Sequence, residues 1–290
     1  MKGQTFAAYK ELCQTLLSQG YTTYTVYEYI KQKPSLKKGV AVLRHDVDVD
    51  PHRALRMAKL EKKLGVRSTY YFRYIPKVFK KSIVRSISDM EFEIGYHYET
   101  LDKSHGISLK AISLFRGELQ EFRKITDVKT VCSHGNVVRN KHYNGVNYDI
   151  FKFQPNLLHE CDLIGEAYLS MPCPPLVYIS DCSQQPNYCE SVRDLIQKIK
   201  SNEKTSYYMS FHPRFWATGI LDSLVISTRI RLFQVSAKAL RSLKKITRAC
   251  NFEKIVISIM KRLFKETIRR DLCGMKFVKK WTQDCYVDVE

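Results

Sequence analysis

The chain reads Val40-Ala41-Val42-Leu43-Arg44-His45-Asp46-Val47-Asp48 where its first strongly apolar run turns polar, and Asp50-Pro51 follow almost directly. The apolar part is typical of a buried strand. Asp50 and Pro51 suit the N-cap and the first position of a helix, and Gly65 suits its end. The stretch therefore predicts a strand followed by a helix, the repeating unit of a parallel α/β fold.

The same alternation of short β-rich runs and helical stretches continues to about Trp216. Seven strands are predicted: Val40–His45, Ser68–Tyr74, Phe92–Tyr98, Lys129–Ser133, Leu163–Tyr168, Leu176–Ser180 and Tyr207–Phe211. Helices are predicted over Thr5–Ser18, from Pro51 to Gly65, and over Ser82–Met90, Leu109–Lys124 and Ser191–Lys200. Strands that alternate with helices form βαβ units, so we expect one parallel sheet.

Composition places the chain among globular proteins, since 44% of its 290 residues are hydrophobic and 27% are charged. Its nine cysteines are odd in number and contain no Cys-x-x-Cys pair, which favours reduced thiols over a disulfide framework or a zinc finger. We see no signal peptide at the start and no apolar run long enough to span a membrane. These features predict a cytoplasmic protein.

Positive charge dominates the chain, with 48 Lys and Arg against 29 Asp and Glu, a net charge of +19. Residues 219–290 hold 16 of the basic residues and 7 of the acidic ones, and an apolar stripe from Phe252 to Leu263 recurs there at helical spacing. We therefore predict two parts, an α/β domain over 1–218 and a basic helical extension over 219–290. The stripe suits either a helix docked on the body or an interfacial helix on an anionic membrane. We do not expect nucleic acid as a partner, because no finger, RNA-binding motif or phosphate loop accompanies the charge.

Ionisable residues stand at the end of nearly every predicted strand. They include Arg73, Asp181 and the candidate site residues Asp46, Asp48, His97, Glu99, His134 and His212. Parallel strands open their carboxyl ends on one face, and alternation along an extended chain sends Asp46 and Asp48 the same way, as it does His97 and Glu99. Each residue alone has an ordinary explanation, as a helix cap, a core histidine, a turn or a strand exit. Together, carboxylate and imidazole groups can bind zinc or another divalent ion. A bound ion of this kind activates water, so the residues favour a hydrolytic reaction.

The order of these elements resembles the polysaccharide deacetylase superfamily, the group with nodulation-factor-type deacetylase homology, over about residues 38–216. The motifs that carry the resemblance are Leu43-Arg44-His45-Asp46-Val47-Asp48, Ser68-Thr69-Tyr70-Tyr71-Phe72, Glu93-Ile94-Gly95-Tyr96-His97, Ser133-His134-Gly135 and Phe211-His212-Pro213-Arg214-Phe215-Trp216. The branch it looks most like is associated with lipopolysaccharide O-antigen and capsule biosynthesis.

The resemblance implies a distorted seven-stranded (β/α) barrel and removal of an N-acetyl group from an amino sugar with a divalent metal, for which zinc is expected. Matched by motif, Asp46 corresponds to the general base, Asp48 and His97 to metal ligands, and His212 to the general acid. His134 corresponds to a substrate-binding position. The substrate would be an N-acetylated sugar, free, polymeric, or linked to a nucleotide or a lipid, and the basic extension suits peripheral contact with the inner membrane.

One departure from the family pattern concerns the second metal histidine, which the family has four residues after the first. Here that position is Leu101. Glu99 is the expected substitute ligand and His134 is the other candidate. If neither binds the metal, the chain would be an inactive deacetylase-like protein that binds carbohydrate.

Overall fold

The computed structural model describes residues 1–135, 145–172, 175–181, 189–201 and 205–228. Contacts divide the chain into two compact units, Met1–Ser223 and Leu224–Glu290. The first unit contains every predicted strand. The predicted amphipathic stripe from Phe252 to Leu263 lies outside the described residues.

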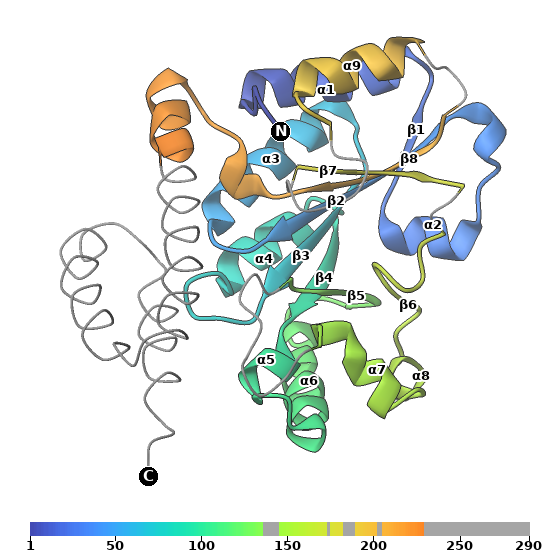
Figure 1. Cartoon of the computed structure of the whole chain (residues 1–290), viewed down its shortest axis with the longest axis vertical. Coiled ribbons are helices and arrows are strands. Elements are labelled where there is room, and N and C mark those ends of the chain that lie inside the picture. Colours follow the sequence, from blue (N-terminus) through green and yellow to red (C-terminus); the bar gives the residue numbers. More distant parts are fainter. Residues whose placement is uncertain (136–144, 173–174, 182–188, 202–204, 229–290) are drawn as a thin grey trace, which may run out of the picture. The chain divides into compact units, whose positions relative to one another are not determined.

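The first unit alternates strands and helices along most of its length (Figure 1). Its strands are β1 (Thr22–Tyr24), β2 (Val40–Val47), β3 (Thr69–Arg73), β4 (Glu93–Tyr98), β5 (Thr130–Ser133), β6 (Gly165–Glu166), β7 (Val177–Ser180) and β8 (Tyr207–Phe211). Its α-helices are α1 (Phe6–Ser18), α2 (Val26–Gln32), α3 (Pro51–Leu64), α4 (Lys81–Ser88), α5 (Thr100–Lys103), α6 (Ser108–Arg123), α7 (Ile150–Phe153), α8 (Leu157–Glu160) and α9 (Val192–Ser201). Short 3₁₀ turns cover Leu36–Lys38, Asn147–Asp149 and Pro213–Phe215.

All pairings in the sheet are parallel, and the strand order is β6-β5-β4-β3-β2-β8-β7. The short strand β1 also pairs with β2, along its first residues. The α/β class and the seven predicted strands are confirmed. The strand β1 was not predicted, because it has only three residues and shows too little alternation to be recognised. A distorted barrel of polysaccharide-deacetylase type remains a prediction.

The first βα unit forms for the local reasons expected from its sequence. The Asp50 side chain accepts a hydrogen bond from the Arg53 backbone N–H at 3.0 Å, and Pro51 opens α3. Gly65 ends the helix with φ +73°, a left-handed conformation that glycine adopts without steric cost. These contacts fix the point at which the chain leaves β2, just beyond its two aspartates.

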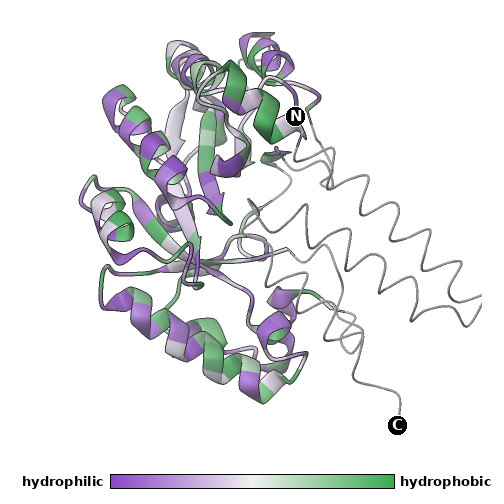
Figure 2. Cartoon of the chain, turned by 90° about the vertical axis from the view of Figure 1, so that its left-hand side faces the viewer, coloured by the Kyte–Doolittle hydropathy of each residue, from purple (hydrophilic) through white to green (hydrophobic). Residues whose placement is uncertain are grey.

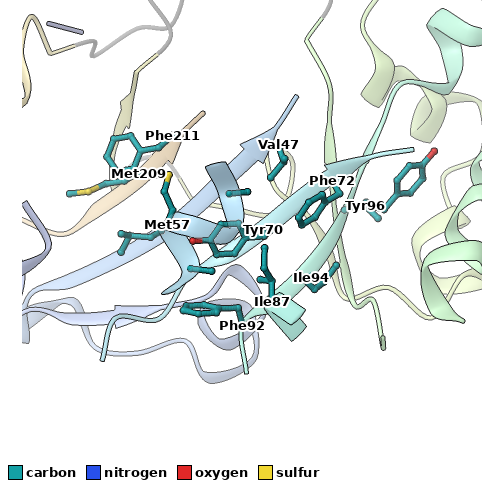
Figure 3. Close-up of a cluster of buried hydrophobic side chains, with 14 of the residues drawn as sticks. Val47, Met57, Tyr70, Phe72, Ile87, Phe92, Ile94, Tyr96, Met209 and Phe211 are labelled. Carbon is teal, nitrogen blue, oxygen red and sulfur yellow. The ribbon is translucent and has the colours of Figure 1, made fainter. Parts of the chain in front are cut away.

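Two hydrophobic clusters pack against the two faces of the sheet. The larger one joins the odd-numbered residues of β2, such as Leu43 and Val47, to side chains of the helices α1, α3, α4, α6 and α9. Figure 3 shows part of it, where Tyr70 and Phe72 of β3 meet Met57 of α3 and Ile87 of α4. Coloured by hydropathy, the helices alternate between hydrophobic and hydrophilic residues, as helices with one buried side do (Figure 2).

The opposite face of the sheet, here called the site face, carries the smaller cluster. It contains Val40 and Val42 of β2, Tyr71 of β3, Cys132 of β5 and Tyr208 of β8. Because side chains alternate along a strand, the next even-numbered residues of β2, Arg44 and Asp46, continue this row toward its carboxyl end. None of the described helices is long and apolar enough to cross a membrane.

Candidate metal centre and active site

The carboxyl ends of β2, β4 and β5 bring three predicted site residues together. Asp48 follows β2, His97 is near the end of β4, and His134 follows β5. Asp48 Oδ1 lies 3.4 Å from His97 Nε2 and 3.2 Å from His134 Nδ1, and the two nitrogens are 3.2 Å apart. These three atoms form a nearly equilateral triangle of ligand atoms, here called the Asp-His-His triangle.

The dimensions of the triangle match one face of a metal coordination tetrahedron. Four ligands at about 2.0–2.1 Å from a zinc ion lie about 3.3 Å from one another. Asp48 Oδ1 is buried and has no hydrogen-bond partner among the described residues, although two imidazole nitrogens lie within 3.4 Å. A buried oxygen without a hydrogen bond is costly, and a cation would satisfy it. The residues present therefore fit a divalent ion.

Neighbouring groups orient both imidazoles toward this point. His97 Nδ1 donates to the backbone carbonyl of Cys132 at 2.9 Å, which leaves Nε2 to face Asp48. The backbone N–H of His134 donates to the Tyr98 carbonyl at 2.8 Å, and the His134 carbonyl accepts from Asn147 Nδ2 at 2.9 Å. Burial lowers the pKa of His134, which favours the neutral imidazole that a metal requires.

Asp48 remains ionised in spite of its burial. Burial alone would raise its pKa, but the Arg214 guanidinium and the His134 imidazole hold the pKa well below its usual range. Arg214 Nη2 lies 3.5 Å from Asp48 Oδ2, and Arg73 Nη1 donates to the Asp48 carbonyl at 3.1 Å. The carboxylate is thus both charged and fixed in place, as a metal ligand must be.

Glu99, the expected third ligand, does not join this triangle. The expectation required β4 to continue through residue 99, but the strand ends at Tyr98 and Glu99 begins the turn into α5. Alternation therefore no longer sets the direction of its side chain. Glu99 Oε2 instead accepts from Arg73 Nη2 at 2.6 Å, and Oε1 lies 3.7 Å from Lys103 Nζ. His134 occupies the position that was expected of Glu99.

Leu101, at the position where the resemblance predicted a second metal histidine, has a fully buried side chain in the larger hydrophobic cluster. It belongs to α5, whereas the triangle is formed at the ends of strands. Leu101 thus packs among apolar side chains, and the third corner of the triangle is His134, which follows β5.

A second group of ligand atoms among the described residues contains Asp46, His97 and Cys132. Its sulfur is already occupied, because Arg44 Nη1 donates to Cys132 Sγ at 2.8 Å. Burial raises the pKa of the Cys132 thiol well above its usual value, so it is not the thiolate that binds metals. The fixed charge of Arg44 also opposes a cation here, and the Asp-His-His triangle is the better site.

Asp46 lies beside the triangle but is held by other partners. Arg44 Nη2 lies 3.5 Å from Asp46 Oδ2, and Ser210 Oγ donates to the same oxygen at 3.4 Å. Burial would raise the pKa of Asp46, but Arg44, His97 and His212 lower it below the ordinary value. Arg44 is itself completely buried and its guanidinium carbon lies 4.2 Å from the centroid of the Tyr168 ring. Asp46 is thus an ionised carboxylate within reach of the site.

His212 faces the two aspartates from the end of β8. Its Nε2 lies 3.9 Å from Asp48 Oδ2 and 4.0 Å from Asp46 Oδ2, while Nδ1 donates to Asp181 Oδ1 at 2.6 Å. Burial would lower the pKa of His212, but Asp181 together with Asp48 and Asp46 raises it to about 9. The imidazole is therefore protonated at neutral pH and can donate a proton from Nε2.

Asp181 was recognised in the sequence only as a polar strand end, and no role was predicted for it. It follows β7 and accepts the His212 backbone N–H at 2.7 Å, as well as Trp216 Nε1 at 3.2 Å and Gln4 Nε2 at 3.3 Å. Four donors thus fix one carboxylate behind His212. The pairing of β7 with β8 brings the two residues together, and no local motif in the sequence indicates it.

Comparisons with known proteins give one structural likeness to report. No protein-family model matches the chain. No curated protein matches it either. A solved structure, described as Streptococcus pyogenes deacetylase PplD in complex with acetate, is similar over 59% of this chain and 71% of that chain, with 10% sequence identity and a TM-score of 0.39. A likeness this weak decides nothing about chemistry, so the interpretation rests on the residues of the site.

Proposed function

We propose that this protein is a metal-dependent hydrolase that removes the N-acetyl group from an amino sugar. The observation that supports it is the Asp-His-His triangle, with a carboxylate on one side and a protonated imidazole on the other. Asp48, His97 and His134 would hold the ion, with zinc the expected metal. When bound, such an ion supplies Lewis acidity, which polarises an amide carbonyl and favours ionisation of water.

Asp46 is the general base in this proposal. Its carboxylate is ionised, does not belong to the triangle and lies on the same face, so it can accept a proton from the attacking water. Arg44 Nη2 lies 3.5 Å from Oδ2 of this carboxylate, and the hydroxyl of Ser210 on β8 donates a hydrogen bond to the same oxygen. A base fixed in this way does not have to be reoriented during the reaction.

His212 is the general acid. After water adds to the acetyl carbonyl carbon, the C–N bond breaks and the departing nitrogen takes the proton from His212 Nε2. Asp181 stabilises the imidazolium before this transfer and keeps Nδ1 protonated, so that Nε2 is the nitrogen that donates. The products are acetate and the free amine, and one water molecule is consumed.

We propose a role in O-antigen or capsule biosynthesis, in the cytoplasm, on a sugar linked to a nucleotide or a lipid. The basic composition of 219–290 supports a peripheral contact with anionic membrane.

Acetate release by the purified, zinc-loaded protein tests the activity. Asp46→Asn and His212→Ala should each reduce kcat by about 10²–10⁴, the usual contribution of general acid and base groups. His52→Ala, a change at an exposed histidine of α3, is the matched control. Undiminished activity in either of the first two variants removes that residue from the mechanism.

The alternative is a carbohydrate-binding protein without activity, which the buried Leu101 favours. Metal analysis separates the two functions. An active enzyme should hold close to one ion per chain after loading, and the His97→Ala variant should lose it. A wild-type protein that binds N-acetylated sugars but holds no metal would be the inactive binder.

A further inference from the structure

Arg214 lies beside Asp48 at the edge of the site, and only part of its charge is compensated. Its Nη2 lies 3.5 Å from Asp48 Oδ2, beyond ordinary hydrogen-bond distance, and its side chain is 40% exposed. Its guanidinium carbon lies 4.5 Å from the centroid of the Phe215 ring, which supports the planar group from one side. Its Nε is buried and has no hydrogen-bond partner among the described residues.

The charges of the site balance only as long as no metal is bound. Three carboxylates (Asp46, Asp48 and Asp181) face three cations (Arg44, His212 and Arg214). The adjoining pairs, Arg73 with Glu99 and Lys103 with Glu118, compensate each other. A divalent ion in the triangle would leave an excess of two positive charges, and an excess of one even with a neutral His212.

An uncompensated charge in a buried site is costly, and a ligand of opposite charge relieves it. Asp48 is the carboxylate that the described residues place beside Arg214. Once Asp48 shares its charge with an ion, the attraction between Asp48 and Arg214 weakens. Arg214 is then the cation of the site that is both exposed and available to a second anion.

We infer that the substrate carries an anionic group, a phosphate or a carboxylate, that binds Arg214, and that Arg214 thereby determines substrate specificity. This inference rests on the proposed function and names the substrate class for the same site. The planar guanidinium offers two parallel N–H donors to such a group, which a lysine cannot do. The net charge of the chain, +19, attracts anionic substrates from solution as well.

Three substrates test the inference with the zinc-loaded protein: N-acetylglucosamine, its 1-phosphate, and the corresponding sugar with a carboxylate at C6. The wild type should prefer at least one anionic sugar over the neutral one by roughly tenfold to a hundredfold in kcat/KM, the range of a hydrogen bond to a charged group. Arg214→Gln should remove this preference, because kcat/KM should fall more for the anionic sugars than for the neutral one, whereas Arg214→Lys should keep part of it. Arg116→Gln, at an exposed arginine paired with Glu160, should keep all of it.

Binding of the sugar phosphate, measured by calorimetry with and without zinc, gives a second readout that needs no turnover. Binding should be tighter with zinc, and Arg214→Gln should weaken it by at least about tenfold. Hydrolysis of all three sugars at equal rates, or equal losses on all three in Arg214→Gln, would overturn the inference and leave the proposed function intact. Binding that depends on Arg214 without hydrolysis of any sugar would overturn the proposed function and support the inference.

Discussion

His212 Nδ1 lies 2.6 Å from Asp181 Oδ1, while Nε2 of the same ring lies within 4.0 Å of both Asp46 and Asp48. One nitrogen of the imidazole thus contacts a fixed carboxylate, and the other nitrogen faces the two aspartates of the site. The pKa of about 9 keeps the ring protonated up to that pH, so activity that requires the acid form should fall as the pH rises above it.

Asp181→Asn should move this alkaline limb to lower pH. Removing an adjacent carboxylate lowers a histidine pKa by roughly 1–3 units, so kcat/KM at pH 8 should fall by roughly twofold to a hundredfold. A pH profile of kcat/KM from pH 5 to 10 measures the shift. Asp162→Asn, at an exposed carboxylate paired with Lys129, is the control. An alkaline limb that stays in place would show that Asp181 does not set the charge of His212.

The two candidates for the third metal ligand make opposite predictions. His134→Ala should weaken zinc binding by more than the roughly 10–100-fold typical of losing a group that only orients a ligand. Glu99→Gln should leave the affinity within about tenfold, because Glu99 contacts Arg73 and Lys103 rather than the triangle. Competition with a chelator of known affinity measures both. Loss of zinc in the Glu99 variant alone would restore the ligand expected from the sequence.

Leu101→His should not improve metal binding, even though the resemblance predicts a metal histidine at this position. The side chain at this position is fully buried in the larger hydrophobic cluster, so an imidazole there would lose packing and hydration, at a cost of about 2–4 kcal/mol. Urea unfolding measures the free energy of unfolding, and zinc titration measures the affinity. Leu101→Met, which conserves volume, should cost less than about 1.5 kcal/mol. A stable histidine variant with tighter zinc binding would contradict the assignment of His134.

Gly95→Ala should destabilise the sheet below the site. A Cβ at Gly95 would lie 2.2 Å from the Tyr71 ring and 3.1 Å from the Thr130 carbonyl. The ring cannot easily move away, because its hydroxyl is 2.7 Å from Thr130 Oγ1. Overpacking of this kind costs about 1–3 kcal/mol, measurable as a lower Tm. Gly117→Ala is the control, because its Cβ meets no atom within 4 Å and alanine favours the helix α6. Equal Tm values for the wild type and the Gly95 variant would contradict this account.

Truncation after residue 228 should abolish binding to anionic vesicles and leave the α/β unit folded. The cut removes all 16 Lys and Arg of the predicted extension, since the first of them is Arg229. It keeps Asp222, whose Oδ2 accepts from Arg53 Nη1 at 2.7 Å. Co-sedimentation with phosphatidylserine vesicles measures binding, and circular dichroism checks folding. If the full-length chain does not sediment with vesicles either, the membrane contact is wrong.

Most of the sheet could be predicted because its signals are local. Asp50, Pro51 and Gly65 act through contacts within a few residues, and each apolar run codes for one strand. Glu99 lies outside the Asp-His-His triangle because β4 ends one residue before it, and this strand end depends on contacts with α5 and Arg73 that the local sequence does not show. The partnership of Asp181 with His212 could not be predicted, since it arises from pairing of strands about thirty residues apart.

The alternation along β2 has a consequence for how this protein can vary. Leu43 and Val47 pack against helices, whereas Arg44 and Asp46 face the site. Packing therefore depends on the odd-numbered residues of this segment, and the chemistry of the site depends on the even-numbered ones. Substitutions can therefore adjust packing and chemistry separately. A deletion of one residue between Val40 and Asp46 would exchange the two sets, burying the carboxylate among apolar side chains. Natural and engineered variants of this strand should thus differ in residue type and never in length.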